Sequence, residues 1–150
     1  MGGVHCNFEA NPHVWRVPFP SKVQDMLVSA DNPTGTITNS DLEHTGMLAQ
    51  VSTIAAHHPV KCATMATFVD NAPAESRVLK KAVAAEGASA KQHMFAAEHQ
   101  REHHHCHVAQ CIPGEANVMA DDASRLQHLT DSEFLSHLSS QCPQRPKGAN

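Results

Sequence analysis

The chain has 150 residues and a mass of 16.2 kDa, which is the size of a single domain. Hydrophobic residues make up 41% of it, enough for a core and too many for a disordered protein. The formal net charge is −4, with 13 histidines counted as neutral. Domains that bind nucleic acid by themselves usually carry a basic face, and this composition shows none. A nucleic-acid role would therefore need positive charge from a neighbouring domain, from metal ions or from protonated histidines.

The sequence carries no signal for a membrane or for secretion. No apolar run approaches the roughly 20 residues that cross a bilayer, and the first residues, "MGGVHCNF", lack the basic and apolar segments of a signal peptide. The five cysteines are an odd number: Cys6, Cys62, Cys106, Cys111 and Cys142. We therefore expect reduced thiols in an intracellular protein, cytoplasmic or nuclear, with no membrane partner.

The first third of the chain predicts two strands and a helix. Residues 2–8 and 13–20 alternate loosely between apolar and polar side chains, which is typical of short strands joined by a turn at residues 11–12. Residues 29–40 predict a loop. A helix is then expected from Ser40 to about residue 57, because apolar residues recur at helical spacing.

The rest of the chain alternates between the two kinds of element. Residues 62–70 are apolar and β-branched and predict a buried strand that ends at Asp70. The following segments are expected to be two helices divided near Gly87, a short strand, and two final helices: 73–87, 89–104, 106–115, and helices from Asn117 and Thr130. This order predicts an α/β domain over residues 1–142, a mixed sheet flanked by helices, with residues 143–150 as a disordered tail.

Three carboxylates lie where an active site could form. Glu43 lies in the first turn of a predicted helix, on the face that carries its apolar residues. Asp70 follows a buried strand, and ligands bind at such strand ends in open α/β sheets. Asp121 lies in the first turn of a later helix. Brought together, the three would hold a hard divalent cation through oxygen.

Each carboxylate also has a structural interpretation. Glu43 could complete a capping box with Ser40, and Asp70 could be a turn residue before a proline. Asp121 and Asp122 could simply favour the positive end of a helix. Spacing alone leaves both interpretations open.

Three strings resemble the ribonuclease H domain of retroelement reverse transcriptase polyproteins: "ITNSDLE" (37–43), "FVDNAP" (68–73) and "NVMADDASR" (117–125). Their order and spacing fit that family over nearly the whole chain. The last string is the most specific, and the positions that match its family pattern are Asn117, Ala120, Asp121, Ser124 and Arg125.

The resemblance implies a ribonuclease H-like fold with Glu43, Asp70 and Asp121 as catalytic residues and ligands of Mg²⁺ or Mn²⁺. Asp122 would be a solvated neighbour. In such enzymes two metal ions, roughly 4 Å apart, hydrolyse the RNA strand of an RNA–DNA hybrid. The implied partners are the hybrid and the upstream reverse transcriptase domain of the same polyprotein.

The chain departs from this family at its start. The family's first aspartate lies on a strand that precedes a Gly-rich strand similar to "MGGV", where this sequence begins. Asp25 and Asp31 are nearby acids, but neither lies in the matching motif. We therefore expect a domain truncated at the N-terminus, its first strand missing or incomplete, that binds metal weakly and is inactive as given.

The segment 99–111, "HQREHHHCHVAQC", suggests an alternative function. Its imidazoles and thiols are zinc ligands, and His103 and His107 would share a helix face. The segment has no Cys-x-x-Cys pair, which structural zinc sites often contain. The alternative is a non-catalytic zinc or nucleic-acid binding module; we instead expect the histidines at 103–105 to be mainly exposed and to bind no structural zinc.

Overall fold

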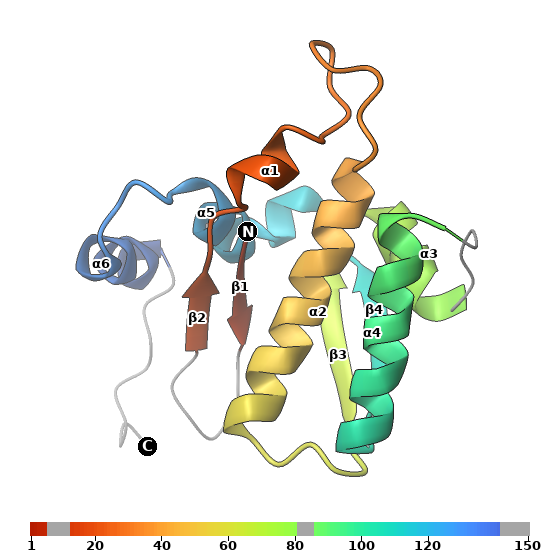
Figure 1. Cartoon of the computed structure of the whole chain (residues 1–150). Helices are drawn as coiled ribbons and strands as arrows, with labels where there is room; N and C mark the ends of the chain where they lie inside the picture. The colour runs from red at the N-terminus through yellow and green to blue at the C-terminus, as the bar shows by residue number, and fades with distance from the viewer. Residues whose placement is uncertain (6–12, 81–85, 142–150) are drawn as a thin grey trace, which may run out of the picture.

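The computed structural model describes residues 1–5, 13–80 and 86–141, and that part of the chain is a mixed α/β structure (Figure 1). Its strands are β1 (Gly2–His5), β2 (His13–Arg16), β3 (Thr64–Val69) and β4 (Cys106–Cys111). Its helices are α1 (Ser21–Gln24), α2 (Asn39–His57), α3 (Ala72–Lys80), α4 (Ala88–His103), α5 (Val118–Arg125) and α6 (Asp131–Gln141), with a 3₁₀ turn at Gly114–Ala116. Four predicted features lie outside the described residues: the end of the first strand (6–8), the turn at 11–12, residues 81–85 of the helix predicted at 73–87, and the tail (143–150).

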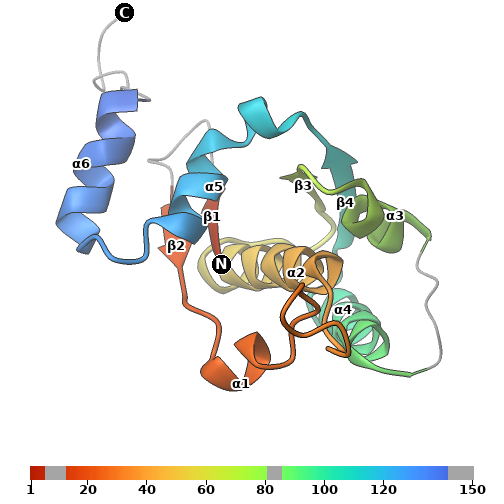
Figure 2. The same cartoon turned by 90° about the horizontal axis from the view of Figure 1, so that it is seen from above.

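The strands form two separate sheets. β1 and β2 pair antiparallel, with Gly2 opposite Arg16, whereas β3 and β4 pair in parallel, with Thr64 opposite Cys106. Across the molecule the order is β2, β1, β3, β4, and no ladder joins β1 to β3 in the described residues (Figures 1 and 2). The α/β class is confirmed, but the described strands are two pairs rather than the single mixed sheet that the element order predicted.

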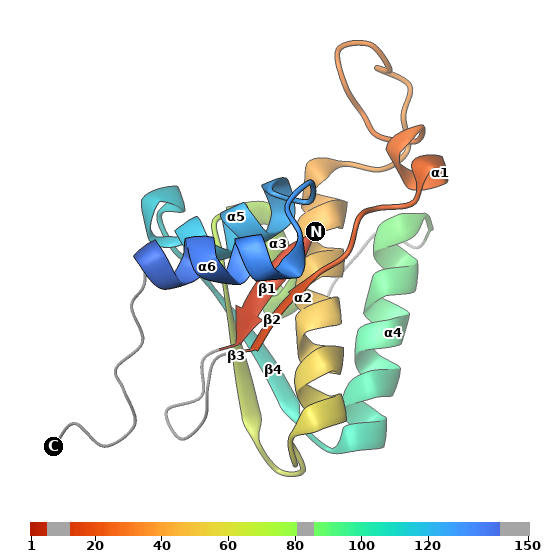
Figure 3. The same ribbon diagram turned by 90° about the vertical axis from the view of Figure 1, so that its left-hand side faces the viewer.

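The helices lie on both sides of the strands. Figure 3 shows α2 and α4 on one side and α5 and α6 on the other. β3 is nevertheless buried on one face only. Met65, Thr67 and Val69 are buried, whereas Thr64, Ala66 and Phe68 on the other face are exposed. The prediction of a fully buried strand is wrong for that second face, where Phe68 is 58% exposed. Its apolar residues indicated burial, but no described helix covers them.

The start of α2 differs from the prediction in a way that matters for the site. Thr38 is the N-cap, and Asp41 completes the capping box: the Asp41 N–H donates to Thr38 Oγ1 at 3.3 Å, and the Thr38 N–H donates to Asp41 Oδ2 at 2.7 Å. Ser40 instead donates its hydroxyl to Asn71 Oδ1 at 3.3 Å. The predicted Ser40–Glu43 box is therefore wrong, and Glu43 has no capping role.

A capping box formed by Thr130 and Glu133 begins α6, where the sequence predicted a helix start. The Glu133 N–H donates to Thr130 Oγ1 at 3.3 Å, and the Thr130 N–H donates to Glu133 Oε2 at 2.8 Å. Arg16 of β2 links this helix to the strands, because its guanidinium lies 4.5 Å above the ring centre of buried Phe134. The same guanidinium donates to the backbone oxygens of Leu126 and Leu129.

Three buried clusters hold these elements together. The first joins α2, β3, α3 and β4, the second lies at the far end of α2, and the third joins α5 to α6. Their buried members are Met47, Val69, Ala74, Val78 and Ala109; Val51, Val60 and Met65; and Ala123, Phe134 and Leu138. None of the helices in the described ranges is long and apolar enough to cross a membrane.

Candidate functional site

A cleft of about 790 Å³ separates β1 from β3. Both strands line it along their whole length, and Figure 2 shows α2 running beneath the gap between them. The 3₁₀ turn and the start of α5 border it through residues 116–120. The α2 side chains that line it are Glu43, Gly46, Met47, Gln50 and Ile54. As the sequence predicted, Glu43 lies on the same helix face as the apolar residues Met47 and Ile54.

Glu43 lines one end of this cleft, and Asp70 and Asp121 each directly follow a residue that lines it, Val69 and Ala120. The pKa of half-buried Glu43 is raised, first by burial and then by the negative charges of Asp70 and Asp121. The ammonium group of Met1 acts in the opposite direction. Because charges act strongly on a pKa only over a few ångströms, Asp70 and Asp121 must lie near Glu43, although the three come from separate elements.

Asn71, rather than Asp70, makes the hydrogen bond of the turn between β3 and α3. The turn into α3 is capped by Asn71, whose Oδ1 accepts a hydrogen bond from the Ala74 N–H at 2.9 Å. Asp70 is exposed at the end of β3, and its Oδ2 would lie 3.8 Å from a Cβ added at Gly114. Asp70 therefore points towards the 3₁₀ turn that borders the cleft, and no hydrogen bond to the local turn occupies it in the described residues.

The two adjacent aspartates of α5 have different partners. Asp121 accepts from Nε of Arg125, one helical turn later, at 2.7 Å, and its side chain is 39% exposed. Asp122 contacts Nε2 of His137 in α6 at 2.7 Å, with its side chain 22% exposed. The prediction of a solvated Asp122 is therefore wrong, since this residue links α5 to α6. Asp121 is the member of the pair that faces the acidic end of the cleft.

These acids converge without forming a complete metal site. Among residues 1–5, 13–80 and 86–141, no three His, Cys, Asp or Glu side chains are grouped closely enough to hold a metal ion. Arg125 also occupies one oxygen of Asp121. The residues as they stand therefore do not fit a two-metal centre, although their charges act on one another.

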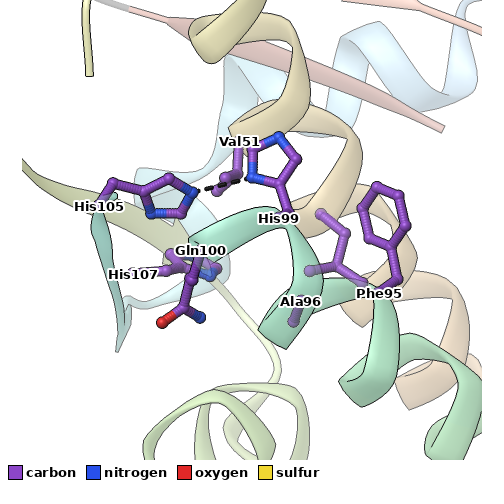
Figure 4. Close-up of a pocket in the computed structure, with 8 residues that line it drawn as sticks. Val51, Phe95, Ala96, His99, Gln100, His105 and His107 are labelled. Atoms are coloured by element: carbon purple, nitrogen blue, oxygen red, sulfur yellow. Dashed lines mark hydrogen bonds between the residues drawn. The ribbon is translucent and has the colours of Figure 1, made fainter. Parts of the chain in front are cut away.

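The histidine segment is more buried than predicted (Figure 4). His99 Nδ1 and His105 Nε2 share a hydrogen bond of 2.8 Å, and His105 is only 8% exposed. The chain turns inward because His104, the C-cap of α4, has a left-handed backbone (φ 52°). The predicted exposure therefore fits His104, whereas His103 is half-buried and the prediction is wrong for His105.

Burial also changes the charge of this segment. It lowers the pKa of both His99 and His105, and the neighbouring imidazolium charge of His103 adds to this effect. His107 lies inside the fold, with Nε2 2.9 Å from Thr67 Oγ1. His99 and His105 therefore carry less positive charge near neutral pH than ordinary histidines, which makes them poorer phosphate-binding groups.

Replacing Glu43 by glutamine is expected to stabilise the fold at pH 7. The folded chain holds this carboxyl proton more tightly than the unfolded chain, so its ionisation disfavours folding as the pH rises through the raised pKa. Solvent screening at this half-buried group limits the gain to about 0.5–1 kcal/mol, or roughly 2–4 °C in Tm. Thermal unfolding of E43Q at pH 7 and pH 4 measures it, and the gain should shrink at pH 4.

The matched control is E98Q, since Glu98 is exposed on α4 and away from the cleft. E98Q should leave Tm unchanged within about 1 °C at both pH values. Destabilisation by E43Q at pH 7 would mean that the Glu43 carboxylate is favourably paired, and would contradict the convergence of the three acids.

Comparison with known proteins does not assign the chain to a family: no family model, no curated protein and no solved structure matches it. The function is therefore argued from the cleft and its residues.

Proposed function

We propose that the chain is a ribonuclease H-like domain of a retroelement reverse transcriptase polyprotein, whose ancestral reaction hydrolyses the RNA strand of an RNA–DNA hybrid. One observation carries this proposal: Glu43 lines one end of a cleft, where the charges of Asp70 and Asp121 both act on it. Each of the three strings that resemble the family contributes one of them. Scattered acids with separate structural roles would give no such convergence.

The chain's own residues would hold and position cations at this end of the cleft. In the family that the strings resemble, divalent ions supply the hydrolytic chemistry; in this chain Glu43, Asp70 and Asp121 are the residues that would hold such an ion, and only loosely. Burial first, and then repulsion from Asp70 and Asp121, raise the pKa of Glu43, and a divalent cation among the three would relieve that repulsion. Arg125 competes for Asp121. Binding is therefore expected to be weak, and the site as it stands to hydrolyse hybrids at no useful rate.

The proposed partners, the hybrid and the reverse transcriptase domain of the same polyprotein, are those that the resemblance implies. A net charge of −4 does not attract a polyanion, so the reverse transcriptase domain of the same polyprotein would supply most of the contacts to the hybrid. The cleft residues would then act on a substrate held mainly by that neighbouring domain.

The alternative is a zinc or nucleic-acid binding module built around residues 99–111. The observation in its favour is the contact between His99 Nδ1 and His105 Nε2 at 2.8 Å. Against it, the described residues provide no third ligand in a group that could hold a metal.

A metal titration followed by NMR separates the two functions. We expect Mn²⁺ at millimolar concentration to broaden the signals of Glu43, Asp70 and Asp121, and Mg²⁺ to reverse the broadening by competition. D121N should weaken this effect several-fold, while E98Q should not. Zinc that binds tightly at His99 and His105, with no Mn²⁺ effect at the three acids, would support the alternative and contradict the proposal.

A further inference from the structure

Four histidine rings gather where the β1–β2 pair meets the last turn of α2. His5 and His13 are directly opposite each other in the antiparallel ladder, so their side chains lie on the same face of the pair. His57 is the last residue of α2, and His58 is its C-cap. β1 and α2 run in the same direction (Figure 1), which brings their final residues to the same end of the molecule. Glu43 lies about four turns earlier in the helix, so roughly 20 Å separates these histidines from the acidic end of the cleft.

Three of the four rings already have nearly the spacing of metal ligands. The ring centre of His58 lies 5.2 Å from that of His5 and 5.5 Å from that of His13. The ring centres of His5 and His13 are 6.5 Å apart. Because a tetrahedral zinc ion lies about 2.0–2.1 Å from each ligand nitrogen, the centres of two imidazoles on one ion are roughly 5 Å apart. The three rings are therefore close to a single ion's ligand spacing.

Binding requires these rings to turn. In the orientations of this structure, no three His, Cys, Asp or Glu side chains of the described ranges are placed to hold an ion. Rotation about the Cβ–Cγ bond of histidine is soft, and it redirects the ring nitrogens at little cost. The backbone fixes the three positions, two in the ladder and one at the helix end. An ion therefore needs side-chain rotation and an approach of His5 and His13 by roughly 1 Å.

The surroundings of His58 favour a cation. Its Nε2 is buried and makes no hydrogen bond within the described residues, and a metal ion would give this atom a partner. His58 also follows the last turn of α2, whose unpaired carbonyl groups carry a partial negative charge. Three imidazole nitrogens suit zinc-class ions, whereas Mg²⁺ prefers oxygen ligands.

A second group of rings, at the end of α4, is less suited to an ion. The ring centres of His99, His103 and His105 are 4.4, 5.1 and 6.5 Å apart. However, His99 Nδ1 and His105 Nε2 are already joined by a hydrogen bond of 2.8 Å. An ion would break that contact, whereas at His58 it would satisfy a buried nitrogen.

We propose that His5, His13 and His58 bind one zinc-class divalent ion, each through one ring nitrogen, with water at the fourth position. The ion ties the β1–β2 pair to the end of α2, in addition to the hydrogen bond from Trp15 to Gln50. No ladder joins that pair to β3 and β4 in the described residues, so a tie to α2 holds β1 in its place beside the cleft. This role is structural and separate from the hydrolysis proposed above.

Titration of residues 1–150 with Zn²⁺ at pH 7 tests this proposal, with Mg²⁺ in excess to occupy the carboxylates. We expect the ring signals of His5, His13 and His58 to shift in ¹H–¹⁵N NMR spectra. At a zinc concentration a hundred times Kd, Tm should rise by at least about 5 °C. If these ring signals do not shift, or if Tm does not rise, the proposal is wrong.

Glutamine variants identify the ligands. H13Q and H58Q should each weaken zinc binding at least tenfold, and because His13 is exposed, H13Q should fold even if H58Q does not. The matched control is H57Q: His57 is exposed and adjacent in sequence, with its ring centre 6.1 Å from that of His13. H57Q should change the affinity less than threefold. Unchanged binding by folded H13Q, or a loss in H57Q as large as in H13Q, would overturn the assigned ligands.

Two further variants separate this site from the others. H99Q should retain zinc binding; its loss in H99Q, with H13Q unaffected, would contradict the proposal and favour a site in residues 99–111. E43Q should also retain zinc binding, so the outcome does not depend on the carboxylates of the proposed function. A loss in E43Q equal to that in H13Q would place the ion at the acids and overturn the proposal.

Discussion

Lowering the pH from 7 to 4 is expected to reduce the free energy of unfolding by about 3 kcal/mol through His44 alone. The pKa of this buried ring is lowered to about 4 from an ordinary value of 6.5, first by burial and then by the positive charges of His93 and Arg77. A hydrogen bond with Gln92 and the charge of Asp41 oppose this only in part.

The direction follows from proton binding. Between pH 6.5 and 4 the unfolded chain binds a proton at this histidine and the folded chain does not, so the stability present above pH 6.5 is lost as the pH falls. Burial also lowers the pKa of four other histidines, which adds to the loss: His5, His93, His99 and His105. Because domains are stable by only about 5–15 kcal/mol, acid unfolding near pH 4.5 is expected.

Urea unfolding at pH 7, 5.5 and 4.5 measures this loss. H44Q removes one titrating ring and should weaken the dependence of unfolding free energy on pH, with the other four histidines accounting for the rest, whereas H128Q, at an exposed position, should keep the full dependence. If H44Q and the unchanged chain lose stability equally, His44 is protonated in the folded state and the argument from its burial fails.

The sequence predicted the helices better than the sheet. Apolar spacing placed α2 correctly to within one residue at both ends. Its cap was wrong because two overlapping patterns, Thr38–Asp41 and Ser40–Glu43, both fit a capping box. The structure decides between them through Arg77, which pairs with Asp41 Oδ1 at 2.7 Å from a helix 36 residues later. No local pattern contains that contact.

The arrangement of the strands was less accessible. The composition of residues 62–70 predicted a strand correctly, but whether both faces are covered depends on where α5 and α6 lie, which is a long-range property. The separation of β1 from β3 could not be predicted from local sequence either, because pairing between them would join segments some 60 residues apart.

The candidate site was predicted in part. The resemblance selected Glu43, Asp70 and Asp121, and the pKa of Glu43 is raised first by burial and then by the charges of Asp70 and Asp121; their role as metal ligands stays a prediction. The partner of Asp122 was missed because His137 lies on another helix. The burial of His105 was missed because it depends on the left-handed backbone of His104, and a run of three histidines does not specify which of them turns inward.

Joining an aspartate-bearing strand to Met1 is expected to give Mg²⁺-dependent cleavage of RNA–DNA hybrids, at least a hundredfold faster than residues 1–150 alone. The Met1 ammonium lies near enough to Glu43 to affect its pKa, so a hairpin loop of two to five residues would lead such a strand into the cleft, antiparallel to β1. An aspartate near the loop would then lie beside Glu43 and supply the missing ligand. Since a displacement of a catalytic metal by about 1 Å can reduce a rate about a hundredfold, restoring this ligand is expected to recover a factor of that size.

Cleavage of a labelled hybrid by the extended chain, with and without Mg²⁺, measures the effect. D121N in the extended chain should abolish cleavage, because it removes a ligand. D122N is the matched control: it breaks the contact with His137 and loses some stability, but at 20 °C it should retain cleavage. Robust cleavage by residues 1–150 alone, lost in D70N, would show that another acid such as Asp25 or Asp31 completes the site. That result would contradict the need for an added strand while leaving the proposed reaction intact, because Asp70 would still be required.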